Sequence, residues 1–406
     1  MSEQTRERSG RRVVIAGAGM AGVQTAVALR EQGFDGPVTL IGAEPHPPYD
    51  RPPLSKGVLL GKGEEAAFDV DFTGLGIDLR LGRRVTGVRP ADKEADTDQG
   101  PVGYDVLVAA TGARPVRLPG TEDAAGVHVL HNLDDALRLR PVLERGESVV
   151  VVGAGWIGAE FTTAAREAGC EVTVVEATGR PLSGALPEEV AVPMGAWYAE
   201  SGATLHTGAR VERVEPGAVL LADGRRLRAD AVVVGIGARP DTAWLGGAVE
   251  LGPQGEVLAD ERLRASAPDV YAVGDCASFP SARYGERLLI HHWDNALQGA
   301  RTVAGSILGE TAAAPYDPVP YFWSEQFGRF VQYAGHHAAA DTLLWRGSPR
   351  DAAWSVCWLR EGRLVALLAV GRPRDLAQGR RLIASGALVD PGLARDPGRP
   401  LKSAVA

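Results

Sequence analysis

The chain has 406 residues, enough for two or three domains at about 150 residues each. Its 45% hydrophobic content excludes general disorder, and its net charge of −8 argues against a dedicated nucleic-acid-binding protein. The charge is uneven. Residues 321–406 hold 12 basic and 7 acidic side chains, a net +5, whereas residues 1–320 carry a net −13.

The three cysteines, Cys170, Cys276 and Cys357, are widely spaced, so the sequence has no CxxC motif. This spacing excludes a dithiol redox motif and a cysteine-rich zinc site, and we predict no metal centre. It also fits a reducing, intracellular setting. No apolar run approaches the about 20 residues that a membrane-spanning helix needs. We therefore expect a soluble, cytoplasmic protein whose first 12 residues form a disordered leader.

A sequence repeat at an offset of 136 residues organises the chain. Residues 13–33 read VVIAGAGMAGVQTAVALREQG, and residues 149–169 read VVVVGAGWIGAEFTTAAREAG. Each copy is typical of a strand, a glycine turn and a helix, and a second strand follows at 38–41 and at 172–175. We therefore predict an α/β fold with two Rossmann-like, doubly wound parallel sheets that have helices on their faces.

Both turns satisfy the GxGxxG pattern between a strand and a helix. The first glycine permits the tight turn, the second lets the backbone approach a pyrophosphate, and the third allows close helix–strand packing. Two such turns favour two bound dinucleotides over glycines that serve packing alone. The glycines are Gly17, Gly19, Gly22, Gly153, Gly155 and Gly158.

Three carboxylates extend this prediction. Glu44 and Glu176 follow the second strands, where each could accept hydrogen bonds from a ribose; the alternative is a strand-end acid exposed to water. Glu176 would favour NADH by repelling the 2′-phosphate of NADPH, although Arg180 lies close enough to keep NADPH open. Asp275 ends an apolar strand and could hold a ribityl hydroxyl of FAD, unless it only forms a turn beside glycine.

A second repeat marks the crossings between domains. Residues 105–115 read DVLVAATGARP and residues 230–240 read DAVVVGIGARP, and we expect each proline to end a buried strand. From about residue 321 the sequence changes, with strand-like stretches at 354–359 and 363–370. We predict a discontinuous FAD-binding domain, an NAD(H)-binding domain and a C-terminal α+β domain. These comprise residues 1–114 with 240–320, residues 115–239, and residues 321–406.

Further motifs relate the chain to a known family. They are PYDRPPLSK at 48–56, ATG at 110–112, GD at 274–275, PYFWSE at 320–325 and RPRD at 372–375. With them, residues 11 to about 390 resemble the FAD-dependent NAD(P)H:ferredoxin reductases of the putidaredoxin-reductase-like type, in the glutathione-reductase structural class. These enzymes serve haem monooxygenases and ring-hydroxylating dioxygenases.

The resemblance implies roles for individual residues. Arg51 would face the FAD diphosphate, and Lys56 would lie under the isoalloxazine ring, paired with Glu160; these two are the implied catalytic residues. Trp293 and Trp323 would border the flavin unless they are core residues. The remaining implied cofactor contacts are Met20, Ala21, Val85, Ala110, Thr111, Gly112, Trp156, Ile157 and Gly237.

The implied activity is the transfer of hydride from NADH to FAD and of single electrons to an iron–sulfur ferredoxin. A disulfide reductase would need a cysteine beside the flavin, and this chain has none before Cys170. Two alternatives stay open: a slow redox sensor related to apoptosis-inducing factor, and a rubredoxin reductase. We expect a monomer or weak dimer.

The basic C-terminal segment suggests where an acidic ferredoxin would dock, because complementary charge steers association. The alternative is ordinary solvated arginine. The candidate docking residues are Arg346, Arg350, Arg372, Arg374, Arg380 and Arg381.

Overall fold

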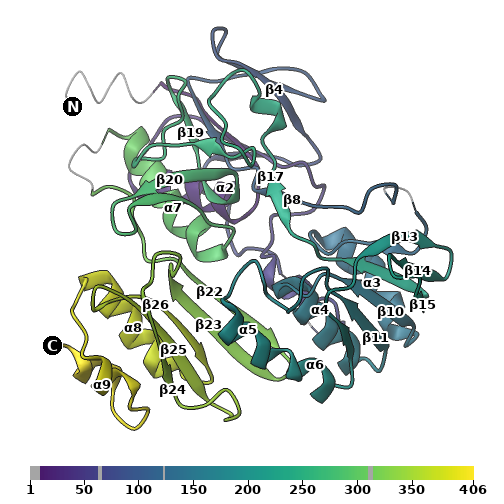
Figure 1. Ribbon diagram of the computed structural model, residues 1–406. Helices are drawn as coiled ribbons and strands as arrows, with labels where there is room; N and C mark the ends of the chain where they lie inside the picture. The colour runs from purple at the N-terminus through teal and green to yellow at the C-terminus, as the bar shows by residue number, and fades with distance from the viewer. Residues whose placement is uncertain (1–9, 63–65, 122–123, 310–313) are drawn as a thin grey trace. The chain divides into compact units, whose positions relative to one another are not determined.

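The computed structural model describes residues 10–62, 66–121, 124–309 and 314–406 (Figure 1). Residues 1–9 of the predicted leader lie outside the described residues, but the prediction is wrong for Arg11 and Arg12, which form ion pairs with Asp269 at 2.6 Å and with Asp105 at 3.1 Å. The chain divides into two compact units: unit 1 contains 1–50, 67–114 and 239–322, and unit 2 contains 51–66, 115–238 and 323–406. The division into three domains stays a prediction. Within the described ranges, no helix combines the length and apolarity that crossing a bilayer requires.

Unit 1 is built on a five-stranded parallel sheet in the order β19-β7-β1-β2-β3. The central strand β1 (Val13–Ala16) is fully buried and pairs with β2 (Val38–Ile41) and β7 (Val106–Ala109), as the apolar runs predict. Helices α2 (Met20–Glu31) and α7 (Trp293–Ile307) pack together beside it. The other strands are β3 (Ile77–Arg80), β4 (Val85–Arg89), β5 (Glu94–Thr97), β6 (Val102–Gly103), β18 (Val257–Leu258), β19 (Val270–Ala272), β20 (Ala277–Ser281) and β21 (Glu286–Leu289).

Unit 2 has the same spatial arrangement in a parallel sheet of order β12-β11-β10-β16-β9, but its edge strand β9 precedes the other four in the chain whereas β19 follows its neighbours. The two predicted Rossmann-like sheets are therefore confirmed. Its strands are β9 (Val127–His128), β10 (Ser148–Val152), β11 (Glu171–Val175), β12 (Thr204–His206) and β16 (Ala231–Val234), and a small antiparallel sheet adds β13 (Val211–Glu215), β14 (Ala218–Leu221) and β15 (Arg226–Arg228). Its helices are α3 (Leu133–Glu144), α4 (Trp156–Glu167), α5 (Glu188–Met194) and α6 (Ala196–Glu200).

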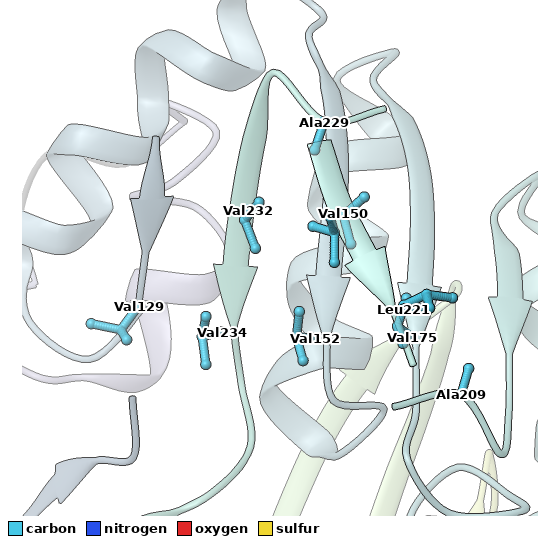
Figure 2. Packing of buried hydrophobic residues seen from close by; sticks show 10 residues of the cluster. Val129, Val150, Val152, Val175, Ala209, Leu221, Ala229, Val232 and Val234 are labelled. Atoms are coloured by element: carbon cyan, nitrogen blue, oxygen red, sulfur yellow. The ribbon is translucent and has the colours of Figure 1, made fainter. Parts of the chain in front are cut away.

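Both faces of the unit 2 sheet are buried, which explains its continuous valine runs. Alternate residues on neighbouring strands, Val150 with Val152 and Val232 with Val234, join one apolar cluster with Leu221 of β14 (Figure 2). Val151, which lies between these two valines of β10, faces α4 instead. A Cβ added to Gly158 of that helix would lie 3.6 Å from Cγ1 of Val151.

The repeat also duplicates an arginine near the end of each first helix. Arg30 donates to the carbonyls of Phe34 (2.7 Å) and Gly36 (2.8 Å) after its own helix, and to Leu75 (2.8 Å) and Gly76 (2.8 Å) before β3. Arg166 likewise donates to the carbonyls of Cys170 and, before β12, of Ser201 (3.1 Å). Each guanidinium thus ties helix, loop and third strand together.

The two Gly-Ala-Arg-Pro segments differ from the expectation. The buried strands β7 and β16 end at Ala109 and Val234, before the glycines, and not at the prolines. Residues Ala113–Pro115 and Ala238–Pro240 form short strands of their own, β8 and β17, which pair in a two-stranded sheet. Proline is tolerated there because it ends a short strand that has no further ladder bonds to make.

The C-terminal part of unit 2 forms a five-stranded sheet in the order β22-β23-β26-β25-β24, and α8 packs against its strands β23 and β26 (Figure 1). The predicted strands at 354–359 and 363–370 are confirmed. The elements are β22 (Tyr321–Gln326), β23 (Arg329–Gly335), β24 (Thr342–Arg346), β25 (Trp354–Arg360), β26 (Arg363–Val370), α8 (Pro373–Ser385) and α9 (Pro391–Arg395). Short 3-10 turns are η1 (Pro52–Ser55), η2 (Ala243–Leu245), η3 (Gly274–Cys276) and η4 (Leu401–Ala404).

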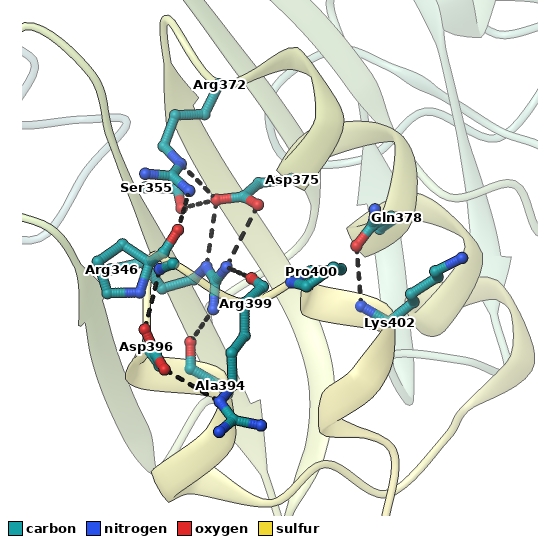
Figure 3. Close-up of polar contacts among 12 residues, drawn as sticks. Arg346, Ser355, Arg372, Asp375, Gln378, Ala394, Asp396, Arg399, Pro400 and Lys402 are labelled. Carbon is teal, nitrogen blue, oxygen red and sulfur yellow. Dashed lines mark hydrogen bonds and ion pairs between the residues drawn. The ribbon is translucent and has the colours of Figure 1, made fainter.

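One predicted docking residue is part of this fold and not of its surface. The Arg346 side chain is 0% exposed and pairs with Asp375 at 3.1 Å (Figure 3). It also donates to the carbonyls of Ala394 and Arg399, while Arg372 donates to Asp375 at 2.6 Å. The prediction that Arg346 contributes to docking is therefore wrong, because this guanidinium is buried and all its contacts are with the C-terminal part of the chain. Arg350, Arg374 and Arg381 are exposed.

Candidate functional site

The first glycine turn joins β1 to α2 in unit 1. Gly17 has a φ of +111°, and a Cβ there would lie 2.2 Å from the carbonyl oxygen of Ala110, just beyond β7. A Cβ on Gly22 would lie 1.8 Å from the Gly17 oxygen, whereas a Cβ on Gly19 would meet nothing within 4 Å. The first and third glycines are therefore required by the protein itself, and the second borders open space that a ligand can enter.

The second turn, between β10 and α4 in unit 2, has the same geometry. Gly153 has a φ of +102°, and its Cβ would lie 2.4 Å from the carbonyl oxygen of Gly235, just beyond β16. The Cβ of Gly158 would lie 2.1 Å from the Gly153 oxygen, and that of Gly155 would again meet nothing within 4 Å. The equivalence extends to Gly112 and Gly237, which both have positive φ after the neighbouring strand.

The helix ends at both turns suit an anion. Neither Gly19 nor Gly155, the N-cap residues of α2 and α4, provides a side-chain cap, and neither helix has an acidic residue in its first turn. By contrast, α3 is capped by Asn132 and has two aspartates in its first turn. The two glycine-turn helices thus leave their N-terminal N–H groups and dipole to an external anion, as a dinucleotide pyrophosphate requires.

The two predicted ribose carboxylates follow the second strand of each sheet. Glu44 follows β2 and accepts a hydrogen bond from the Tyr49 hydroxyl. Glu176 follows β11; its Oε2 accepts from the Ala154 N–H (2.9 Å), and its Oε1 accepts from the N–H (2.9 Å) and hydroxyl (2.8 Å) of Thr178. Glu176 is therefore held against the glycine turn, and Thr178 is a contact that the sequence analysis missed.

The other unit 1 candidates gather at the carboxyl edge of its sheet. Asp275 lies in η3 directly after β19, and a Cβ on the preceding Gly274 would lie 3.0 Å from that of Ala21 in the first turn of α2. The Thr111 hydroxyl donates to the Asp241 carbonyl at 2.6 Å. Met20 begins α2. Val85 instead begins β4 in a separate antiparallel sheet, where it pairs with Thr97.

Trp293 is the first residue of α7, so its backbone N–H belongs to the helix terminus, as its predicted backbone role requires. Its indole Nε1 donates to Asp50 Oδ1 at 2.7 Å. The preceding His292 stacks on Phe322 with ring centroids 4.2 Å apart, and burial lowers the pKa of His292 to about 4. Among the described residues, no group of three or more histidine, cysteine or acidic side chains suits a metal ion.

In unit 2, Lys56 and Glu160 form the predicted pair. Lys56 Nζ lies 2.9 Å from Glu160 Oε2, and the two side chains are 23% and 7% exposed. The segment 51–66 belongs to the same compact unit as α4, and Arg51 donates to the His131 carbonyl. Trp323 lies on β22, and Trp156 and Ile157 begin α4.

The structure surrounds Glu160 with groups that the sequence analysis missed. The Ser55 hydroxyl donates to Oε2, the Ser324 hydroxyl donates to Oε1 at 2.7 Å, and the Glu325 N–H reaches Oε1 at 3.3 Å. Ser55 could have been suspected because it precedes Lys56 in the motif. Nothing in the sequence marks Ser324 as a partner of residue 160.

All three thiols are buried and free. Burial raises the pKa of Cys276 to about 11 and that of Cys357 to about 12, and it also raises the pKa of Cys170. A thiol that stays protonated is a poor nucleophile. These cysteines are therefore unsuited to disulfide exchange.

Comparison with known proteins gives consistent matches. A model described as pyridine nucleotide-disulphide oxidoreductase matches residues 11–300, and one described as reductase C-terminal matches residues 321–405. The 5,5'-dehydrodivanillate O-demethylase ferredoxin reductase subunit of Sphingobium sp. (strain NBRC 103272 / SYK-6) is 37% identical over 97% of this chain and 98% of its own.

Two solved structures have the same fold over nearly the whole chain. Fdr9 is 43% identical with a TM-score of 0.90, covering 96% of this chain and 99% of its own. A chain in the covalent putidaredoxin reductase–putidaredoxin complex is 33% identical with a TM-score of 0.90, covering 97% of this chain and 98% of its own.

Proposed function

Because the chain belongs to the pyridine nucleotide-disulphide oxidoreductase family, we propose that it is an FAD-containing, NADH-dependent ferredoxin reductase. The observation that carries the proposal is the pair of glycine turns with equivalent backbone geometry, each open at its second glycine, in a chain whose thiols are all buried. The first feature suits two dinucleotides, and the second removes the thiol route by which a disulfide reductase passes its electrons onward.

The names of its relatives indicate the acceptor. The Sphingobium relative is a ferredoxin reductase subunit, and putidaredoxin reductase is seen joined to putidaredoxin. By analogy, this chain reduces an iron–sulfur ferredoxin in the cytoplasm, and that ferredoxin serves a haem monooxygenase or a dioxygenase. One NADH then reduces two one-electron acceptors and releases one proton.

Each group of site residues has a separate role in this reaction. Bound FAD supplies the exchange between the two-electron nicotinamide and the one-electron acceptor. The turn at Gly17–Gly22, with Asp275 and Glu44, binds FAD, and the turn at Gly153–Gly158, with Glu176, binds NADH. By the family resemblance, Arg51 would contact the FAD diphosphate, and Trp293 and Trp323 would border the ring. Lys56 would place a positive charge beside the flavin, and Glu160 would hold that charge in place.

The test of this proposal is anaerobic stopped-flow mixing with NADH and NADPH, followed by turnover with a panel of purified ferredoxins. We expect rapid flavin reduction by NADH and rapid ferredoxin reduction. A long-lived charge-transfer complex with slow ferredoxin reduction would instead identify a redox sensor and overturn the proposal.

Lys56→Met should slow flavin reduction about 100-fold, because it removes a preorganised charge, while leaving FAD bound. The matched control is Lys62→Met. Lys62 lies in the same segment, but its ion pair with Glu167 is more than half exposed on both sides. Equal flavin reduction rates in the two variants would remove Lys56 from the mechanism.

A further inference from the structure

Glu160 is a meeting point of three chain segments that are far apart in the sequence. Its Oε2 accepts from Ser55 and Lys56, which lie at the end of η1. Its Oε1 accepts from the hydroxyl of Ser324 and from the N–H of Glu325, both on β22. Glu160 itself lies on α4. One carboxylate therefore joins the Lys56 segment, the second glycine-turn helix and the C-terminal sheet.

This junction is enclosed. Ser55, Glu160 and Ser324 are all buried, and Ser324 is 1% exposed. A buried carboxylate needs its acceptor positions filled, and the four donors here correspond to its roughly four lone-pair sites. Ser324 also accepts a longer hydrogen bond from Gln326 Nε2 at 3.4 Å, which orients its own hydroxyl proton toward Glu160.

The two carboxylate oxygens of Glu160 have different partners and therefore different roles. The terminal torsion of a glutamate side chain is broad, so a carboxylate held at one oxygen alone can rotate about its last bond. Ser324 fixes Oε1 at 2.7 Å, and this anchors the plane of the carboxylate to β22. Oε2 is thereby aimed at Lys56 Nζ, 2.9 Å away.

We propose that Ser324, with Ser55, is a positioning residue of the reductase: it orients Glu160 so that Lys56 is held in place beside the flavin. The inference rests on the proposed function, since it assigns Ser324 an effect only through Lys56. Because Ser324 immediately follows Trp323 on β22, the same contact ties the strand that carries this tryptophan to the charge of Lys56.

The test compares Ser324→Ala with Ser324→Thr and with a matched control, Thr163→Val. Thr163 accepts from the Phe327 N–H at 2.8 Å, so it also joins α4 to the end of β22 but does not touch Glu160. Ser324→Ala should slow flavin reduction at saturating NADH about tenfold, with an unchanged dissociation constant for NADH. Ser324→Thr, which keeps the hydroxyl, and Thr163→Val should both react at the wild-type rate.

Two readouts separate positioning from a structural role. The flavin midpoint potential of Ser324→Ala should move in the same direction as that of Lys56→Met, and by less. Labelling of Lys56 with an amine reagent, followed by mass spectrometry, should be faster in Ser324→Ala than in Thr163→Val. Ser55→Ala, which acts on the other oxygen, should change both readouts in the same sense.

A double-mutant cycle tests whether Ser324 acts on flavin reduction through Lys56. Added to Lys56→Met, the Ser324→Ala change should slow flavin reduction no further, because its effect runs through Lys56. Additive losses, or a Ser324→Ala variant that matches the wild type, would overturn the inference and leave the proposed function standing. A Lys56→Met variant with normal flavin reduction would instead overturn the role of Lys56 in the proposed function.

Discussion

At the scale of single residues, Glu176 is the position where coenzyme choice can be tested. Its carboxylate is held on both sides, by Ala154 of the glycine turn and by Thr178, so it has one fixed orientation at the end of β11. A fixed negative charge at a ribose site favours a 2′-hydroxyl and repels a 2′-phosphate. Arg180, which lies 3.8 Å from Glu188, is the nearest cation along the chain.

We therefore expect Glu176→Gln to strengthen NADPH binding about tenfold and to weaken NADH binding by less, since the amide keeps one acceptor oxygen but loses the charge. Glu171→Gln is the control, because it makes the same change at the exposed opposite end of β11. Dissociation constants for both coenzymes, measured by titration of the holoenzyme, give the comparison. If the ratio of the NADPH and NADH dissociation constants did not change, this carboxylate would not distinguish the two riboses.

At the scale of elements, the C-terminal sheet and its two helices are joined by one buried ionic cluster. Arg346 ends β24, Asp375 lies in the first turn of α8, and Ser355 on β25 donates to the same carboxylate at 2.8 Å. The carbonyls of Ala394 and Arg399 bring α9 and the following chain to the guanidinium. A buried cluster of this kind is costly to break from one side, because loss of Arg346 removes one of the two cations that pair with Asp375 and leaves the carbonyls of Ala394 and Arg399 without their donor.

Arg346→Met should accordingly lower the free energy of unfolding by about 3–5 kcal/mol. The double variant Arg346→Met/Asp375→Leu should lose less than Arg346→Met alone, since the buried carboxylate is then removed together with its buried partner, and the Arg372 that also loses Asp375 is 22% exposed and is partly solvated. Arg381→Met, an exposed arginine of α8, should stay within about 0.5 kcal/mol of the wild type. Urea unfolding of the three variants measures this, and equal losses for Arg346 and Arg381 would contradict it.

At the scale of the whole molecule, the uneven charge bears on association with a partner. Burial of Arg346 removes one charge from the predicted docking set, while the half-buried Arg372 and Arg380 stay candidates and the pairing of Arg372 with Asp375 offsets part of its charge. Arg350, Arg374 and Arg381 are exposed and can still steer an acidic ferredoxin. Such steering acts through the association rate and is screened by salt within about 8 Å at physiological ionic strength.

The triple replacement of Arg350, Arg374 and Arg381 by glutamine should lower kcat/KM for ferredoxin about tenfold at low ionic strength, and the difference should vanish near 1 M salt. Its rate of flavin reduction by NADH should not change. Arg225→Gln, which alters an exposed arginine next to β15, is the control. If turnover of the wild type with ferredoxin did not depend on salt, these arginines would not contribute to docking.

The parts of this molecule that were predictable are those whose cause is local in the sequence. The strand at 38–41 and the roles of Gly17, Gly19 and Gly22 follow from apolar runs and backbone sterics, and the repeat then implies a second parallel sheet. The burial of Arg346 and the approach of Ser324 to Glu160 depend on segments far apart in the chain. No periodicity or spacing reports such convergence, so only the structure reveals it.

The strand order of unit 1 has a consequence for biosynthesis. Its sheet has β19 at one edge, beside β7, but residues 115–238 separate these neighbours in the chain. As the polypeptide leaves the ribosome, the edge of β7 that faces away from β1 has unpaired backbone groups until Ala272 of β19 has emerged. By then all five strands of the unit 2 sheet have already been synthesised. A nascent chain halted in this interval presents a bare apolar edge, which invites misassembly with other chains. Chaperone demand during synthesis should therefore concentrate between the completion of β16 and that of β19.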